Sequence, residues 1–207
     1  MEKLLQSIGN LKNSKIKKLV ECRIKEFKRL GKESNNEIFK ELCFCILTAN
    51  YSAEKGIIIQ KAIDDGFLNL TKSELAKKLK SLGYRYPNKR AQYIVGARKH
   101  KNMLKKIIKS LNGNELRKWV VANIKGLGYK EASHFLRNIG YDGFAIIDFH
   151  IIDLLEKHRL LKGPKTLTKK KYLEIEALLN KISEKSKLNL SELDLYLWYM
   201  ETGRILK

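Results

Sequence analysis

A lysine and an aspartate that could share one reaction lie close together in the second half of the chain. Lys130 follows a glycine-rich turn that contains Gly126 and Gly128, and Asp148 follows a short apolar run. A turn of this kind that leads into a helix directs backbone N–H groups toward a place where a phosphate can bind. The positive end of the helix dipole disfavours the ammonium form of a lysine there, and an unprotonated amine is a nucleophile. The pattern predicts a lysine and a carboxylate that act together on a nucleic-acid backbone.

The charge of the chain also favours a polyanionic partner. Its 207 residues include 43 Lys and Arg but only 22 Asp and Glu, which gives a formal net charge of +21. Heat-adapted proteins also gain lysine, but they gain glutamate with it, and here the acidic residues do not keep pace. An excess of this size is unusual for a metabolic enzyme and indicates nucleic-acid binding.

The cysteines and the apolar runs restrict the cellular setting. The three cysteines, Cys22, Cys43 and Cys45, have neither the spacing of a disulfide framework nor that of a zinc site, and the last two should be buried. The chain begins without the pattern of a signal peptide, and no apolar run approaches the length of a membrane span. We therefore expect a soluble cytoplasmic protein with no membrane partner, which associates with the nucleoid through DNA and acts as a monomer.

The elements that must position Lys130 and Asp148 are helices. Apolar residues recur at helical spacing along nearly the whole chain, and alternating runs typical of strands are almost absent. The segment 119–138 has the pattern of a helix, a tight turn and a second helix. Capping patterns predict helix starts at Ser52, at Thr71 with Glu74, at Asp148, and at Ser191 with Asp194. The fold class expected from these signals is all-α.

Three features together resemble the helix-hairpin-helix DNA glycosylase superfamily. They are the glycine-rich hairpin with Lys130, the cluster Asp148-Phe149-His150, and the apolar helix 42–50 that ends in Asn50. The resemblance covers about residues 41–153. The chain lacks a four-cysteine cluster near its C-terminus, which separates it from the iron–sulfur branches of that superfamily. Its small size and its ending are similar to those of the compact archaeal-type 8-oxoguanine DNA glycosylases.

The resemblance implies a fold, a reaction and a partner. The fold is two helical lobes with a DNA-binding cleft between them: residues 33–138 form a central lobe that ends in the hairpin, and residues 1–32 plus 139–207 form the other. The reaction is base excision with strand cleavage, and the partner is double-stranded DNA that contains oxidised guanine. No cofactor and no metal are needed for this chemistry.

The resemblance also assigns the two catalytic residues. Lys130 attacks the sugar C1′, displaces the damaged base and forms a Schiff base, from which β-elimination cuts the strand. Asp148 stabilises the positive charge that develops on the sugar and helps to deprotonate the amine. An alternative role for Asp148 is the N-cap of a helix, and the two roles are compatible.

The resemblance assigns further residues to two roles, binding of the DNA backbone and flipping of the damaged nucleotide. The turn glycines, Gly126 and Gly128, hold a phosphate, and His150 matches a position that contacts phosphate, although it could equally be a histidine at a packing interface. Asn50 corresponds to the polar residue that enters the space left by the flipped nucleotide, and its alternative role is a helix C-cap. Arg85 and Tyr86 belong to a loop that can wedge into DNA, or they are part of an ordinary turn.

Recognition of the damaged base is assigned to two residues near the C-terminus and to two residues of the helix that carries Lys130. Trp198 stacks on the extruded purine unless it belongs to the core, and Lys207 binds that base unless the chain end is frayed. Ser133 and His134 share a helical face with Lys130 and are expected to line the pocket. The identity of the base depends on the resemblance alone, so two alternatives stay open. They are a glycosylase of the same fold for another oxidised base, and a non-catalytic module that only binds DNA.

Overall fold

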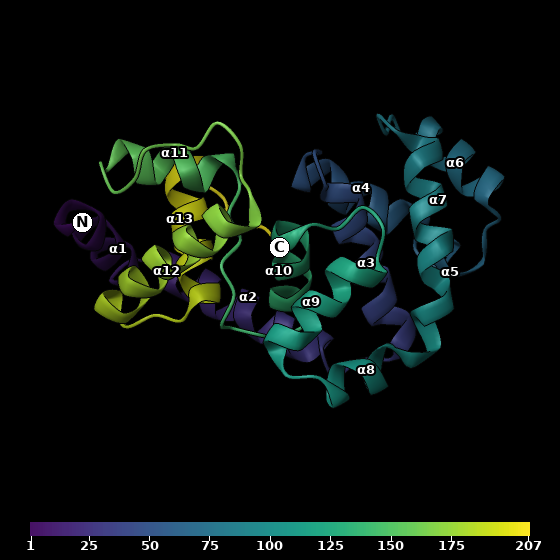
Figure 1. Cartoon of the computed structure of the whole chain (residues 1–207), viewed down its shortest axis with the longest axis horizontal. Coiled ribbons are helices and arrows are strands. Elements are labelled where there is room, and N and C mark those ends of the chain that lie inside the picture. Colours follow the sequence, from purple (N-terminus) through teal and green to yellow (C-terminus); the bar gives the residue numbers. More distant parts are fainter. The chain divides into compact units, whose positions relative to one another are not determined.

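The computed structural model describes all residues, 1–207, and every regular element in it is helical (Figure 1). In chain order the elements are α1 (Glu2–Lys12), α2 (Ile16–Leu30), α3 (Asn35–Thr48), α4 (Ala53–Ile63), α5 (Gly66–Asn69), α6 (Lys72–Ser81), α7 (Pro87–Ala97), the 3₁₀ helix η1 (Arg98–Met103), α8 (Leu104–Ser110), α9 (Gly113–Asn123), α10 (Tyr129–Asn138), α11 (Phe149–Lys157), α12 (Lys169–Ser186) and α13 (Leu190–Thr202). The predicted all-α class is confirmed. None of these helices combines the length and the apolar character that crossing a bilayer requires.

The chain divides into two compact units. Unit 1 comprises Met1–Arg29 and Leu136–Lys207, and unit 2 comprises Leu30–Phe135. Both boundaries lie three residues earlier than the sequence suggested, at 30 rather than 33 and at 136 rather than 139. The second boundary falls inside α10, so this helix begins in one unit and ends in the other.

Unit 2 is organised around α3. Every residue from Ile38 to Thr48 is buried, because α4, α5, α7, η1 and α8 all pack against this helix. Cys43 and Cys45 are buried in this helix, as the apolar sequence around them predicted, and neither forms a disulfide. A helix that is covered on all sides provides a rigid base for the residues that follow its last turn.

Unit 1 contains the chain ends. A buried cluster joins α2 to α13 through Ile16, Val20 and Phe27 on one helix and Leu195 and Tyr196 on the other. Ile205, from the non-helical tail that follows α13, packs against the same cluster. The tail that carries Lys207 is therefore anchored two residues before its end.

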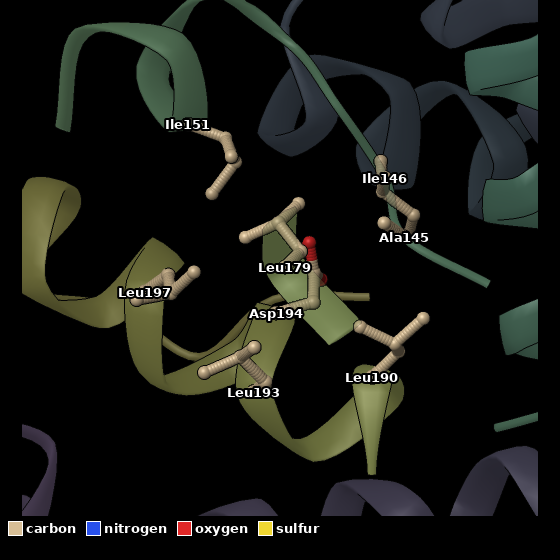
Figure 2. Close-up of a pocket in the computed structure, with 8 residues that line it drawn as sticks. All are labelled: Ala145, Ile146, Ile151, Leu179, Leu190, Leu193, Asp194 and Leu197. Carbon is tan, nitrogen blue, oxygen red and sulfur yellow. The ribbon is translucent and has the colours of Figure 1, made fainter. Parts of the chain in front are cut away.

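A buried ion pair connects α10 with α13 inside unit 1. Arg137 donates a hydrogen bond to Asp194, and the guanidinium also lies 4.9 Å from the centre of the Phe27 ring. Asp194 borders a small cavity of about 10 Å³ whose other lining residues are apolar, as Figure 2 shows. This volume holds at most one water molecule, so the cavity is far too small for a purine base.

Removal of one partner of this pair should be strongly destabilising. We expect Asp194→Ala to lower the free energy of unfolding by about 3–5 kcal/mol, because Arg137 would remain buried without its counter-charge. The double variant Arg137→Met/Asp194→Leu should recover most of that loss. Urea unfolding of the variants measures both effects, and a loss below about 1 kcal/mol for Asp194→Ala would contradict the role of the pair.

Three of the four predicted helix starts are confirmed. Ser52 caps α4, Thr71 and Glu74 form a reciprocal capping box on α6, and Asp148 caps α11. The prediction for the last helix is wrong, because Asn189 and Glu192 form its capping box. Ser191 lies inside α13 and donates a hydrogen bond to the Tyr141 carbonyl, while Asp194 is engaged by Arg137.

Candidate active site and nucleic-acid interface

The hairpin between α9 and α10 requires a glycine at one of its two glycine positions. Gly126 has a φ of +91°, and a Cβ atom there would lie 2.5 Å from Cδ2 of Tyr93. A side chain at Gly128 would meet only the Glu131 carboxylate, at 3.4 Å, and the φ of Gly128 lies outside the left-handed range. Backbone conformation and packing therefore both require a glycine at position 126, whereas neither requires one at position 128.

This difference predicts unequal effects of alanine in the hairpin. Gly126→Ala should lower the free energy of unfolding by about 2 kcal/mol or more, because a left-handed φ and a steric clash with Tyr93 act together. Gly128→Ala is the matched control and should cost less than about 1 kcal/mol. Thermal unfolding of both variants checks the expectation, and equal losses would show that the φ of Gly126 does not constrain the hairpin.

Lys130 is the second residue of α10, and its amine is paired with the next residue. Lys130 Nζ lies 3.4 Å from Glu131 Oε1, and the lysine side chain is 24% exposed. The other carboxylate oxygen of Glu131 accepts the Gly128 N–H at 3.1 Å. One carboxylate thus holds both the amine and a hairpin N–H that the sequence assigned to a phosphate. A phosphate that binds this N–H must displace Glu131, a residue that the sequence interpretation overlooked.

Asp148 is both a helix cap and a partly accessible carboxylate. Its Oδ1 accepts the Ile151 N–H at 3.1 Å, and the residue is half-buried in unit 1. The non-helical segment 144–147, which leads into it, is buried and hydrogen-bonded to α12. The cap role that the sequence left as an alternative is confirmed, and it fixes the orientation of the side chain.

Two side chains of α12 hold the segment that precedes Asp148. The Tyr172 hydroxyl donates to the Ala145 carbonyl at 2.6 Å and accepts the Ile147 N–H at 3.4 Å. Glu176 accepts the Ala145 N–H at 3.1 Å. These residues lie four positions apart, on one face of α12, and they anchor the backbone directly before the carboxylate.

His150 and Trp198 contact each other within unit 1. Their ring centres are 4.9 Å apart with an interplanar angle of 84°, which is an edge-to-face arrangement. His150 is exposed, whereas Trp198 is half-buried and its indole N–H is covered without a hydrogen-bond acceptor. Lys207 is half-buried at the end of the tail that Ile205 anchors. The histidine therefore has a packing partner and still has a surface available to solvent.

Asn50 and the loop after α6 present exposed polar side chains in unit 2. Asn50 follows the last turn of α3 with a φ of +59°, a conformation that asparagine tolerates better than most residues. Arg85 and Tyr86 are also exposed, and the Arg85 guanidinium lies 5.0 Å from the centre of the Tyr86 ring. Their neighbour Tyr84 is buried and belongs to the interior.

Ser133 and His134 are both buried inside unit 2. Their place in a base-binding pocket stays a prediction. Ser133 accepts a hydrogen bond from Arg117 at 3.4 Å, and the His134 ring packs edge-on against Phe44 at 5.6 Å. A helical offset of three or four residues places them on a common face with Lys130, but this face turns into the core within one turn of α10. The side chains in the structure form no cluster of three or more His, Cys, Asp or Glu residues that could hold a metal ion.

Comparisons with known proteins identify the fold and the family of the chain. The fold is that of the helix-hairpin-helix DNA glycosylases, and residues 20–188 match the family described as 8-oxoguanine DNA glycosylase. The 8-oxoguanine DNA glycosylase/AP lyase of Methanocaldococcus jannaschii is 57% identical over 99% of both chains, and that of Korarchaeum cryptofilum is 51% identical over 100% of this chain and 99% of its own. The chain therefore belongs to the 8-oxoguanine DNA glycosylase family.

Solved structures extend the likeness from sequence to fold. The crystal structure of the Methanocaldococcus jannaschii enzyme in complex with a 15mer DNA containing 8-oxoguanine has a TM-score of 0.96 and 56% identity, and the match covers 99% of this chain and 100% of that one. The Thermotoga maritima enzyme has a TM-score of 0.94 and 46% identity over 100% of this chain and 99% of its own.

Proposed function

We propose that this protein removes 8-oxoguanine from DNA and then cuts the strand at the resulting abasic site. The observation that carries the proposal is the likeness over nearly the whole chain to enzymes named for both activities. One of the similar structures was solved with DNA that contains 8-oxoguanine. The net charge of +21 supports a DNA partner, and we propose that the protein acts on double-stranded DNA as a cytoplasmic monomer.

In the proposed reaction Lys130 is the nucleophile. Its unprotonated amine attacks C1′ of the damaged nucleotide, the C1′–N9 bond breaks, and the base leaves after it gains a proton. The second proton on the nitrogen then passes to O4′ as the C1′–O4′ bond breaks, which opens the sugar ring and gives a Schiff base. A base then removes a proton from C2′, and the C3′–O bond breaks with release of the 3′ strand. Lys130 must leave Glu131 before the first step, because the carboxylate competes for the same amine.

Asp148 is proposed to stabilise the transition state of base removal. Positive charge develops on the sugar as the glycosidic bond breaks, and a fixed carboxylate lowers the energy of that charge. The cap hydrogen bond to Ile151 and the anchored segment before Asp148 hold this carboxylate in one orientation. Preorganised charge of this kind is effective because it needs no rearrangement when the reaction occurs.

The remaining residues are proposed to bind the substrate. His150 and the hairpin at Gly126 and Gly128 contact the DNA backbone. Asn50 fills the space that the flipped nucleotide leaves, next to a wedge of Arg85 and Tyr86. The extruded base is bound by Trp198, whose unpaired indole N–H is available to an acceptor, and by the C-terminal residue Lys207.

A borohydride trapping assay tests the function. The protein is incubated with duplexes that each contain one lesion, 8-oxoguanine, an oxidised pyrimidine or an abasic site, and with an undamaged duplex. We expect a trapped covalent complex and strand cleavage with 8-oxoguanine and with the abasic site. Trapping with an oxidised pyrimidine alone would assign another lesion, and the absence of trapping with every duplex would indicate a non-catalytic DNA-binding module.

A further inference from the structure

Two buried side chains hold the C-terminal end of α3, directly before Asn50. The Tyr84 hydroxyl donates to the Leu47 carbonyl at 2.6 Å, and Arg90 Nη2 donates to the Ala49 carbonyl. Arg90 Nε also donates to the Tyr84 hydroxyl at 3.1 Å, which links the two side chains. Because the last carbonyls of a helix have no partner within that helix, this pair satisfies buried groups that would otherwise lack a hydrogen bond.

The guanidinium of Arg90 is buried without a carboxylate. Arg90 is 8% exposed and Tyr84 is 4% exposed, and the hydrogen-bond partners of Arg90 are the phenol oxygen and a backbone carbonyl. Burial raises the pKa of the Tyr84 phenol, although Arg90 partly opposes that shift, so the phenol stays neutral and the pair is not an ion pair. A buried cation with only neutral partners is unfavourable for folding alone, and this points to a role beyond stability.

The same guanidinium borders the hairpin. Arg90 Nη1 lies 3.4 Å from the position that a Cβ atom on Gly126 would occupy. One side chain of α7 thus bonds to the residue before Asn50 and lies beside the turn that is proposed to bind phosphate. Both turns have a positive φ, +59° at Asn50 and +91° at Gly126, but only Asn50 carries a side chain that disfavours this conformation, so the Asn50 turn depends on its surroundings to stay in place.

We propose that Tyr84 and Arg90 are positioning residues that hold Asn50 ready to fill the gap left by the flipped nucleotide. The proposal rests on the proposed function, because it specifies how the base-removal step is prepared. When the hydrogen bonds to the Leu47 and Ala49 carbonyls are intact, the exposed amide of Asn50 starts from one fixed backbone. Without them the turn can relax toward a right-handed conformation, and ordering it again adds to the barrier for flipping.

The test compares two reactions of the variant Tyr84→Phe, which loses only the hydroxyl. Under single-turnover conditions we expect removal of 8-oxoguanine opposite cytosine to slow by about tenfold, the effect of one lost hydrogen bond. Cleavage of a preformed abasic site should change by less than about twofold, because that nucleotide has no base to unstack. Arg90→Lys keeps the charge but loses the planar fork whose Nε and Nη2 reach the two acceptors, and it should show the same split.

Tyr172→Phe is a matched control for the chemical change. Its hydroxyl is also buried and also donates to a carbonyl at 2.6 Å, but it holds the segment before Asp148 instead of the Asn50 turn. This variant should slow base removal because of its effect on the carboxylate, and it should leave the fluorescence of 2-aminopurine placed at the flipping site as in the wild type. Tyr84→Phe should reduce that fluorescence change on binding.

A double-mutant cycle with Asn50→Ala completes the test. If Tyr84 acts through Asn50, the double variant should remove the base no more than about twofold slower than Asn50→Ala alone. Additive losses, or equal slowing of base removal and abasic-site cleavage by Tyr84→Phe, would overturn the proposal. Failure of the proposed function itself would be visible separately, because the wild-type protein would then cut neither substrate.

Discussion

Replacement of Lys130 by glutamine is expected to abolish both borohydride trapping and strand cleavage. Glutamine has no amine that can form a Schiff base, so the covalent route is lost and the rate should fall on the order of 10³-fold or more. Glutamine is also shorter and neutral, so its pairing with Glu131 is lost as well. Binding to 8-oxoguanine DNA should survive. Trapping measures the covalent step, and fluorescence anisotropy with the same duplex measures affinity.

Lys125→Gln is the matched control for the loss of positive charge at the hairpin. Lys125 is exposed in the same turn and is not proposed to touch the sugar. This variant should weaken DNA binding slightly and reduce its dependence on salt, while trapping persists. If Lys130→Gln still forms the trapped complex, the nucleophile is another residue and the assignment of Lys130 is wrong.

Local sequence signals predicted most of the helices because such signals act over a few residues. Apolar spacing and the capping patterns at Ser52, Thr71 and Asp148 depend only on neighbours within one turn. The start of α13 was misplaced because Ser191 and Asp194 also have a capping pattern, and nothing local distinguishes them from Asn189 and Glu192. The competing demand on Asp194 is its pairing with Arg137, 57 positions away.

The candidate site was predictable only in part, because some of its contacts join residues that are distant in the sequence. The carboxylate of Glu131 could have been anticipated, because an acidic residue in the first turn of a helix often caps it. The hydrogen bonds that hold the end of α3 could not have been anticipated. Tyr84 and Arg90 donate to the backbone carbonyls of Leu47 and Ala49, and backbone acceptors leave no trace in a sequence. The hydrogen bond that Ser133 accepts from Arg117 could not be predicted either, because Arg117 lies on a different helix, 16 positions away.

Asp148→Asn should separate the catalytic role of this residue from its structural one. Asparagine is as good an N-cap as aspartate, so the free energy of unfolding should change by less than about 0.5 kcal/mol. Without the negative charge, the developing positive charge on the sugar loses its counter-ion, and single-turnover base removal should slow on the order of 10²–10³-fold. Affinity for the lesion duplex should change little, since the carboxylate acts in the transition state.

Asp148→Ala provides the second half of this comparison. Alanine removes the charge and also the hydrogen bond to the Ile151 N–H, so it should cost about 1 kcal/mol of stability in addition to the loss of rate. If the charge is what matters for catalysis, both variants should react equally slowly although their stabilities differ. A full-rate Asp148→Asn enzyme would instead leave Asp148 as a helix cap alone, and the group that balances the charge on the sugar would have to be another acid.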